Sequence, residues 1–169
     1  SMFDRQIDLI MTEFAPVAQK FLKHVAKING LEKMTFADWK LDLDSALNPD
    51  VTIDDAYELV MKSVAPLGEE YTREIANYQK ERWVDFAANA GKDSGGYATD
   101  PYRVHPYVLM SWTGRMSDVY TLIHEIGHSG QFIFSDNSQS YFNTHMSTYY
   151  VEAPSTFNEL LLSDYLEHQ

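Results

Sequence analysis

The sequence predicts a mainly α-helical fold with a small antiparallel β-sheet, and three observations support this prediction. Apolar residues recur at steps of three and four in several long segments, as one buried face of a helix requires. Two shorter segments, 92–97 and 104–112, carry the glycine, β-branched and aromatic residues of a strand pair. The length of 169 residues is enough for one domain with a hydrophobic core, and we expect residues 1–169 to form a single domain.

The apolar periodicity and the residues that start or stop a helix define the predicted helices. These are 5–29, 52–64, 69–90, 117–134 and 148–167. Pro16 should kink the first helix or mark its late start, because proline lacks the amide hydrogen of a helix interior. Thr52 is expected to cap the second helix, with Asp54 and Asp55 in the first turn, where the helix dipole favours negative charge. We expect the apolar stripe on each helix, including 5–29, to face a core.

The composition excludes several classes of protein. With 25 acidic and 13 basic residues the net charge is −12, so a nucleic-acid partner is not expected, because phosphate binding needs a basic patch. The absence of cysteine excludes disulfide bonds and a thiol nucleophile, and it favours the cytoplasm. No apolar run approaches the ~20 residues that a membrane-spanning helix needs, so no membrane partner is expected.

The residues that could bind a metal and catalyse a reaction are concentrated in the helix predicted at 117–134. His124 and His128 are four residues apart, so both imidazoles lie on one face of the helix, with Glu125 between them. In this H-E-x-x-H pattern the histidines bind zinc and the glutamate acts as general base. A catalytic zinc takes three protein ligands and keeps one position for water, so a third ligand is required. Our candidate is Glu152, near the start of the last predicted helix.

Two structural histidines on an ordinary helix are the alternative to a metal site. The zinc site is favoured because the helix is amphipathic and because Gly127, between the histidines, leaves room for a substrate or a neighbouring backbone. Metal-bound histidines normally donate their second ring nitrogen to an acceptor. Glu159 lies two helical turns beyond Glu152 and is the candidate acceptor, against the alternative of a solvated glutamate.

The run from His124 to Ser129, followed by the segment 151–159, resembles the thimet oligopeptidase and oligoendopeptidase F group of zinc metallopeptidases. Within this group it is most similar to oligoendopeptidase F. Other segments that look like this family are 65–71, 81–83, 91–97, 105–109 and 118–122. The resemblance spans about residues 40–167, whereas residues 1–39 match more weakly. The combination of segments is far more specific than the metal motif alone.

The resemblance implies that the chain is part of a larger gluzincin-like catalytic domain. It implies that His124, His128 and Glu152 bind one zinc ion and that Glu125 is catalytic. It further implies that an edge strand of the sheet pairs with the substrate backbone, and we expect 104–110 to be that edge. The residues assigned to substrate binding on this basis are Val104, His105, Tyr107 and Val108. For His105, which precedes a proline, a structural histidine at the strand end is the favoured alternative.

We therefore expect a zinc endopeptidase that hydrolyses peptide bonds in short oligopeptides, with a zinc-activated water and Glu125 as general base. The family's transition-state tyrosine and histidine donors would lie downstream of Gln169, so this chain is expected to be a piece of a longer protein. The first alternative is accordingly a fragment that binds zinc without turnover of its own. The second is a helical interaction module that binds no metal.

Overall fold

The computed structural model describes residues 1–41 and 49–169, which belong to two compact units, 1–48 and 49–169. Among the described residues, none of the helices combines the length and the apolar character needed to cross a membrane.

The first unit is one long helical segment with a local change of pitch. Its elements are α1 (Met2–Leu9), a π-helical turn (Ile10–Phe14), α2 (Ala15–Ile28) and a 3₁₀ turn (Phe36–Lys40). The π turn ends at Phe14, and Pro16 lies in the first turn of α2. Because the proline ring cannot fit an uninterrupted α-helical ladder, the wider turn accommodates it and the helix continues. The predicted disturbance at Pro16 is therefore confirmed as a change of hydrogen-bond pattern.

Within the described part of this unit no core covers the apolar stripe of α1 and α2, so the core that the stripe predicts is not found inside the unit itself. Large apolar side chains that keep more than half of their surface accessible are Ile7, Ile10, Met11, Phe14, Val17 and Phe21. Val25 is the buried residue of these two helices. Burial of a stripe requires a second layer, and the described part of the unit supplies only a short 3₁₀ turn besides the helix.

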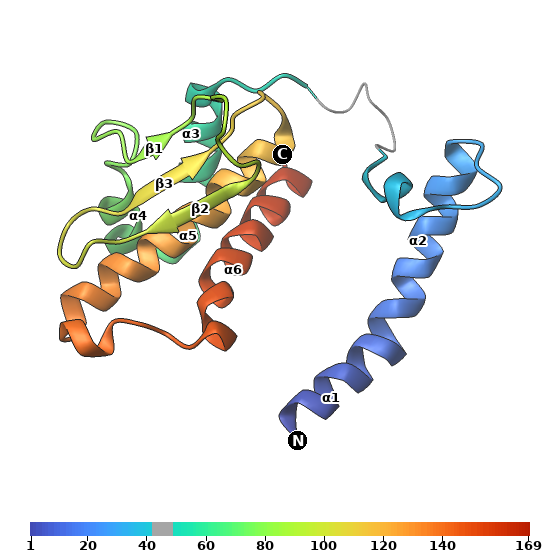
Figure 1. Cartoon of the computed structure of the whole chain (residues 1–169), viewed down its shortest axis with the longest axis horizontal. Helices are drawn as coiled ribbons and strands as arrows, with labels where there is room; N and C mark the ends of the chain where they lie inside the picture. Colours follow the sequence, from blue (N-terminus) through green and yellow to red (C-terminus); the bar gives the residue numbers. More distant parts are fainter. Residues whose placement is uncertain (42–48) are drawn as a thin grey trace. The chain divides into compact units, whose positions relative to one another are not determined.

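The second unit holds a small sheet beside a pair of long helices (Figure 1). Its elements are α3 (Ile53–Ser63), a 3₁₀ turn (Ala65–Leu67), α4 (Glu69–Ile75), β1 (Val84–Asp85), β2 (Gly96–Thr99), β3 (Tyr107–Met110), α5 (Met116–Ser138), a 3₁₀ turn (Tyr141–Asn143) and α6 (Thr148–Glu167). Helix α5 packs against α6, against β2 and β3, and against α3 and α4. It is therefore the central element of the unit.

The sheet confirms the predicted mainly α fold with a few strands, but its pairing is mixed. The strand order is β1–β3–β2, with β1 parallel and β2 antiparallel to β3. In register, Val84 lies opposite Val108 on one side of β3, and Ala98 lies opposite Val108 on the other. Strand β3 is thus the central strand, and the expectation that 104–110 forms an edge was wrong.

The sequence analysis did not predict β1, because β1 lies inside segment 69–90, which was expected to be a helix. Helix α4 ends at Ile75, and the chain then turns until Arg82, whose φ of 57° is left-handed. The Trp83 amide donates to the carbonyl of Tyr78, closing this turn. Both aromatic side chains are buried in the core, so tertiary burial overrides the helical apolar pattern.

A core fills the space between the sheet and the helices. Val108 and Met110 point from β3 toward α5, in keeping with the alternation of strand side chains. The predicted inner face of α5 is buried, and its residues are Val119, Leu122, Ile123 and Ile126. Thr52 caps α3 through a reciprocal pair of hydrogen bonds with Asp55, as predicted. The core thus fixes α5 against the sheet on one side.

On the side of α5 that faces away from the sheet, two glycines allow close contact with α6 and with Tyr71 of α4. A Cβ atom added at Gly127 would lie 2.6 Å from the Cα of Ser155 in α6, which is a collision with backbone. A Cβ atom at Gly130 would lie 2.5 Å from the ring of Tyr71. The Tyr71 hydroxyl accepts a hydrogen bond from Asn158 of α6, and its ring stacks on Phe134. The space expected at Gly127 is therefore filled by a neighbouring backbone.

We expect Gly127→Ala to destabilise the protein by about 1–3 kcal/mol, because the new methyl group forces α5 and α6 apart. Urea denaturation measures this free energy of unfolding. Ser117→Ala, at an exposed position of the same helix, is the matched control and should change stability by less than about 0.5 kcal/mol. Equal stabilities of the two variants would contradict the close contact.

Candidate metal centre

Two helices bring the three predicted metal ligands together. His124 and His128 project from one face of α5, and Glu152 comes from the first turns of α6. The Oε2 atom of Glu152 lies 3.2 Å from Nε2 of His124 and 3.4 Å from Nε2 of His128. Candidate ligand atoms of all three side chains lie within 4.8 Å of one another. Within the described ranges this is the group of three found capable of holding a metal ion.

These distances match a zinc site. Tetrahedral coordination with bonds of about 2.0–2.1 Å separates neighbouring ligand atoms by about 3.3 Å. The two nitrogen–oxygen distances to Glu152 agree with that value. Two imidazoles and one carboxylate are also a donor set that catalytic zinc uses, with a fourth position for water. The residues present therefore fit a zinc ion.

Burial keeps one of the histidines in the form that binds metal. His128 is mostly buried, and this burial lowers its pKa, because a charged imidazolium loses its hydration. The negative charge of Glu152 acts in the opposite direction and the neighbouring His124 in the same one. Since a metal ligand must be the neutral imidazole, the lowered pKa favours binding.

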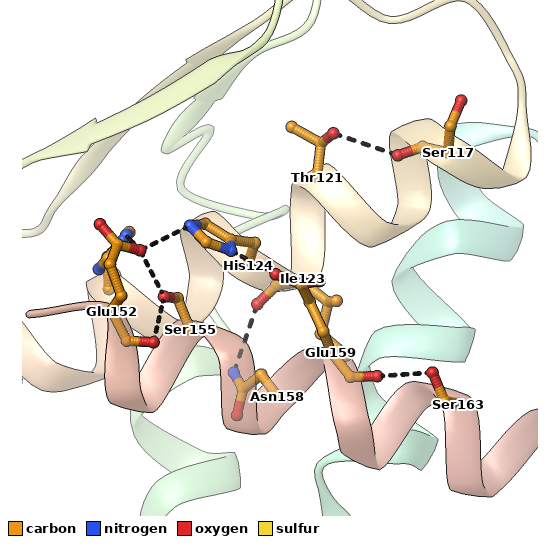
Figure 2. A network of polar contacts seen from close by, with 10 residues as sticks. Ser117, Thr121, Ile123, His124, Glu152, Ser155, Asn158, Glu159 and Ser163 are labelled. Atoms are coloured by element: carbon orange, nitrogen blue, oxygen red, sulfur yellow. Dashed lines mark hydrogen bonds and ion pairs between the residues drawn. The ribbon is translucent and has the colours of Figure 1, made fainter. Parts of the chain in front are cut away.

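Glu159 accepts the hydrogen bond that the sequence suggested for it. Its Oε1 atom lies 2.5 Å from Nδ1 of His124, and Figure 2 shows Glu159 and Glu152 on opposite sides of that imidazole ring. With Nδ1–H donating to Glu159, the free lone pair is on Nε2, the atom nearest Glu152. The contact therefore fixes both the tautomer and the orientation of His124.

Glu125 lies beside the ligands, between α5 and β2, and only 5% of its surface is exposed. Burial raises its pKa, and the charge of Glu152 adds to this, whereas His124 and a backbone hydrogen bond from Ala98 lower it. Its Oε2 atom is buried and has no hydrogen-bond partner among the described residues. A carboxylate whose pKa is raised is a better proton acceptor, which suits a general base.

A pocket of about 310 Å³ opens at these side chains. It is lined by residues of β2, α5 and α6, which are Gly96, Tyr97, Ala98, His124, Glu125, His128, Phe132, Val151 and Glu152. The strand β2 therefore forms one wall of the pocket. A Cβ atom at Gly96 would lie 3.1 Å from Oε1 of Glu125 and 2.8 Å from Thr121, so only glycine allows this approach.

The four residues assigned to substrate binding lie outside this pocket. Val108 pairs with a strand on each side and is buried in the core, and Tyr107 pairs with Thr99 of β2. His105 stacks on Trp83, with ring centroids 5.6 Å apart and an interplanar angle of 3°. Val104 and His105 line a different pocket together with Trp83. The basis for their assignment was therefore wrong.

The sheet edge beside the candidate metal ligands belongs to β2, whereas the sequence analysis assigned the edge to another strand. No other strand of the described residues pairs with the side of β2 that faces away from β3. The glycine pair at Gly95 and Gly96 was the available signal, since strand glycines often mark a close backbone approach. The segment 92–97 was expected to be one strand of a pair, but peptide binding was assigned to its partner.

The chain resembles known peptidases in sequence and in fold. The model of a family described as Peptidase family M3 matches residues 3–169. Oligopeptidase PepF of Bacillus subtilis is 33% identical over 151 residues, covering 89% of this chain and 22% of that protein. An oligoendopeptidase F homolog of Borreliella burgdorferi is 32% identical over 158 residues, covering 92% of this chain and 27% of that protein.

The comparison with solved structures also finds a peptidase-like fold. A Chlamydophila abortus protein of known structure superposes with a TM-score of 0.75 at 31% identity, covering 96% of this chain and 27% of its own. This chain thus spans about a quarter of the length of the relatives it matches. The family match includes residues 3–39, where the sequence motifs were weakest.

We expect Glu159→Gln to weaken zinc binding by about 10–100-fold, because the amide is a poorer acceptor for the Nδ1–H of His124. Competition with a chromogenic chelator measures the zinc Kd. The matched control is Glu167→Gln, at an exposed position of the same helix, which should leave the Kd unchanged. A Kd as tight as wild type in Glu159→Gln would show that the contact with His124 is not used.

Proposed function

Because the chain belongs to Peptidase family M3, we propose that it is the zinc-binding part of an endopeptidase that hydrolyses peptide bonds in short oligopeptides. The observation that carries this proposal is the convergence of His124, His128 and Glu152 on one point, with the buried Glu125 beside them. The names of the relatives, oligopeptidase and oligoendopeptidase F, support peptides as the substrate class.

Glu125 is the proton carrier in the proposed reaction. Zinc, when bound at the three ligands, would supply polarisation of the scissile carbonyl and a lowered pKa of the attacking water. Glu125 accepts the proton of that water and delivers it to the leaving amine nitrogen. Burial raises the pKa of the Glu125 carboxyl, which suits both steps.

The free edge of β2 is the proposed binding place for the substrate backbone. An extended peptide added there would pair with main-chain groups along the side of β2 that faces away from β3, in the mode known as β-augmentation. The Ala98 amide already hydrogen-bonds the Glu125 carboxyl, so this edge and the proposed base are adjacent. A peptide bond held at β2 would therefore lie beside the proton carrier.

The alternative is a fragment that binds zinc but does not cleave peptides. It is supported by the length of the chain, which covers about a quarter of its relatives. Zinc analysis of protein purified without chelator tests the metal site, with one zinc per chain expected. An internally quenched oligopeptide is then tested as substrate of this chain and of the longest natural chain that contains it. Cleavage by this chain indicates an active endopeptidase, whereas cleavage by the longer chain alone indicates a zinc-binding fragment without turnover. Absence of zinc from both would leave the metal-free helical module.

Glu125→Gln should retain zinc and lose peptide cleavage, with kcat lower by about 10²–10⁴-fold or more, because the amide cannot accept the proton. The assay uses the longest natural chain that contains these residues. Zinc content measured on the same preparation separates lost chemistry from lost metal. Undiminished turnover of the variant would rule out Glu125 as the base.

The same replacement should stabilise the zinc-free protein at neutral pH. Burial raises the folded pKa of Glu125 above its ordinary value, so the wild-type protein loses stability as the pH rises from that ordinary value through the folded pKa. Glutamine does not ionise, so the gain in Tm of Glu125→Gln over wild type should grow from acidic to neutral pH. A gain in Tm that is independent of pH would contradict the burial of an ionised carboxylate.

Gly96→Ala should lower kcat/KM by at least about 10-fold, because its methyl group displaces β2 from Glu125 and Thr121. Zinc content should be unchanged, since no ligand contacts Gly96 in this way. Ser94→Ala, at an exposed position just before β2, is the control and should retain wild-type activity. Full activity of Gly96→Ala would show that β2 need not lie against Glu125.

A further inference from the structure

We propose that Ser155 is a positioning residue for the third metal ligand, holding the Glu152 carboxylate in its binding orientation. This inference rests on the proposed zinc site. Ser155 lies in α6 one turn beyond Glu152, and its hydroxyl is 3.1 Å from Oε2 of Glu152 (Figure 2). That oxygen is the atom that also lies 3.2 Å and 3.4 Å from the two imidazole Nε2 atoms. The hydroxyl therefore contacts the oxygen that points at the metal position.

Glu152 needs such a contact because little else restrains it. The Glu152 side chain is 58% exposed and has several rotatable bonds, so it loses much rotamer freedom when it is held in one place. Apart from the two imidazoles, Ser155 supplies the polar side-chain contact of this carboxylate in the described part of the chain.

Ser155 can act as a fixed donor because its own position is fixed. Its side chain is fully buried, and its Cα lies where a Cβ atom of Gly127 would collide with it. One turn further on, Asn158 donates to the hydroxyl of Tyr71 and to the carbonyl of Ile123 in α5. These contacts set the rotation of α6 on α5, and with it the direction of the Ser155 hydroxyl.

The role can be tested without disturbing the fold. Ser155→Ala removes only an oxygen atom, and the second acceptor of the hydroxyl, the carbonyl of Glu152, lies in the backbone of a helix. The exposed carboxylate of Glu152 remains solvated. The variant therefore loses the orientation of Glu152 and leaves no buried polar group without a partner.

The experiment compares the zinc Kd of wild type, Ser155→Ala and Ser63→Ala in the longest natural chain that contains these residues. Ser63 is a buried serine of α3 whose hydroxyl donates to the carbonyl four residues earlier, so it controls for the loss of a buried hydroxyl. We expect Ser155→Ala to bind zinc about 10–100-fold more weakly and Ser63→Ala to bind it like wild type. The visible spectrum of the Co²⁺-loaded protein should shift in Ser155→Ala alone, since it reports ligand geometry.

Two results would overturn the inference while the zinc site stands. One is a wild-type Kd and Co²⁺ spectrum in Ser155→Ala. The other is an equal loss of affinity in Ser63→Ala, which would indicate a general effect of stability. Wild-type protein that does not bind one zinc per chain would instead overturn the proposed function, and this inference with it.

Discussion

The close contact of α5 and α6 at Gly127 is the constraint on which the site depends. Histidine side chains on one helix can meet a carboxylate from another only when the two axes are near enough, and any larger residue at Gly127 would collide with the backbone of Ser155. The contact also brings Glu159 to the far side of His124. A position without a side chain therefore determines where four functional side chains meet.

The electrostatics of the site follow from the same packing. The sheet covers one side of α5 and α6 covers another, so Glu125 and His128 lose contact with water. This burial raises the pKa of Glu125 and lowers the pKa of His128, and both shifts favour the neutral form of the side chain. Glu152 and Glu159 remain more exposed, and each lies within ion-pair distance of the His124 imidazole. The candidate site thus combines a buried imidazole of lowered pKa, a buried carboxyl of raised pKa and two more exposed carboxylates.

Much of the site was predictable because helical geometry is local. The spacing of His124 and His128 places them on one face whatever surrounds the helix, and Glu152 followed from the need for a third ligand. The sheet was harder to predict, since the order of strands depends on pairing over long distances in the sequence. A two-residue strand such as β1 has no periodicity, and the burial of Tyr78 and Trp83 resembled a helical stripe. Without the order β1–β3–β2, the free edge was assigned to the wrong strand.

The placement of the metal centre within the chain has a consequence for folding. The candidate metal ligands, Glu125 and Glu159 all lie within residues 124–159. They belong to α5 and α6, which are joined by a short connection. Such an antiparallel helical pair has low contact order, so its loop-closure entropy is small and its contacts can form early. The wall formed by β2 comes from earlier in the chain, so it is already synthesised when the helices emerge from a ribosome. Every part of the centre is thus present in the nascent chain once Glu159 has been added.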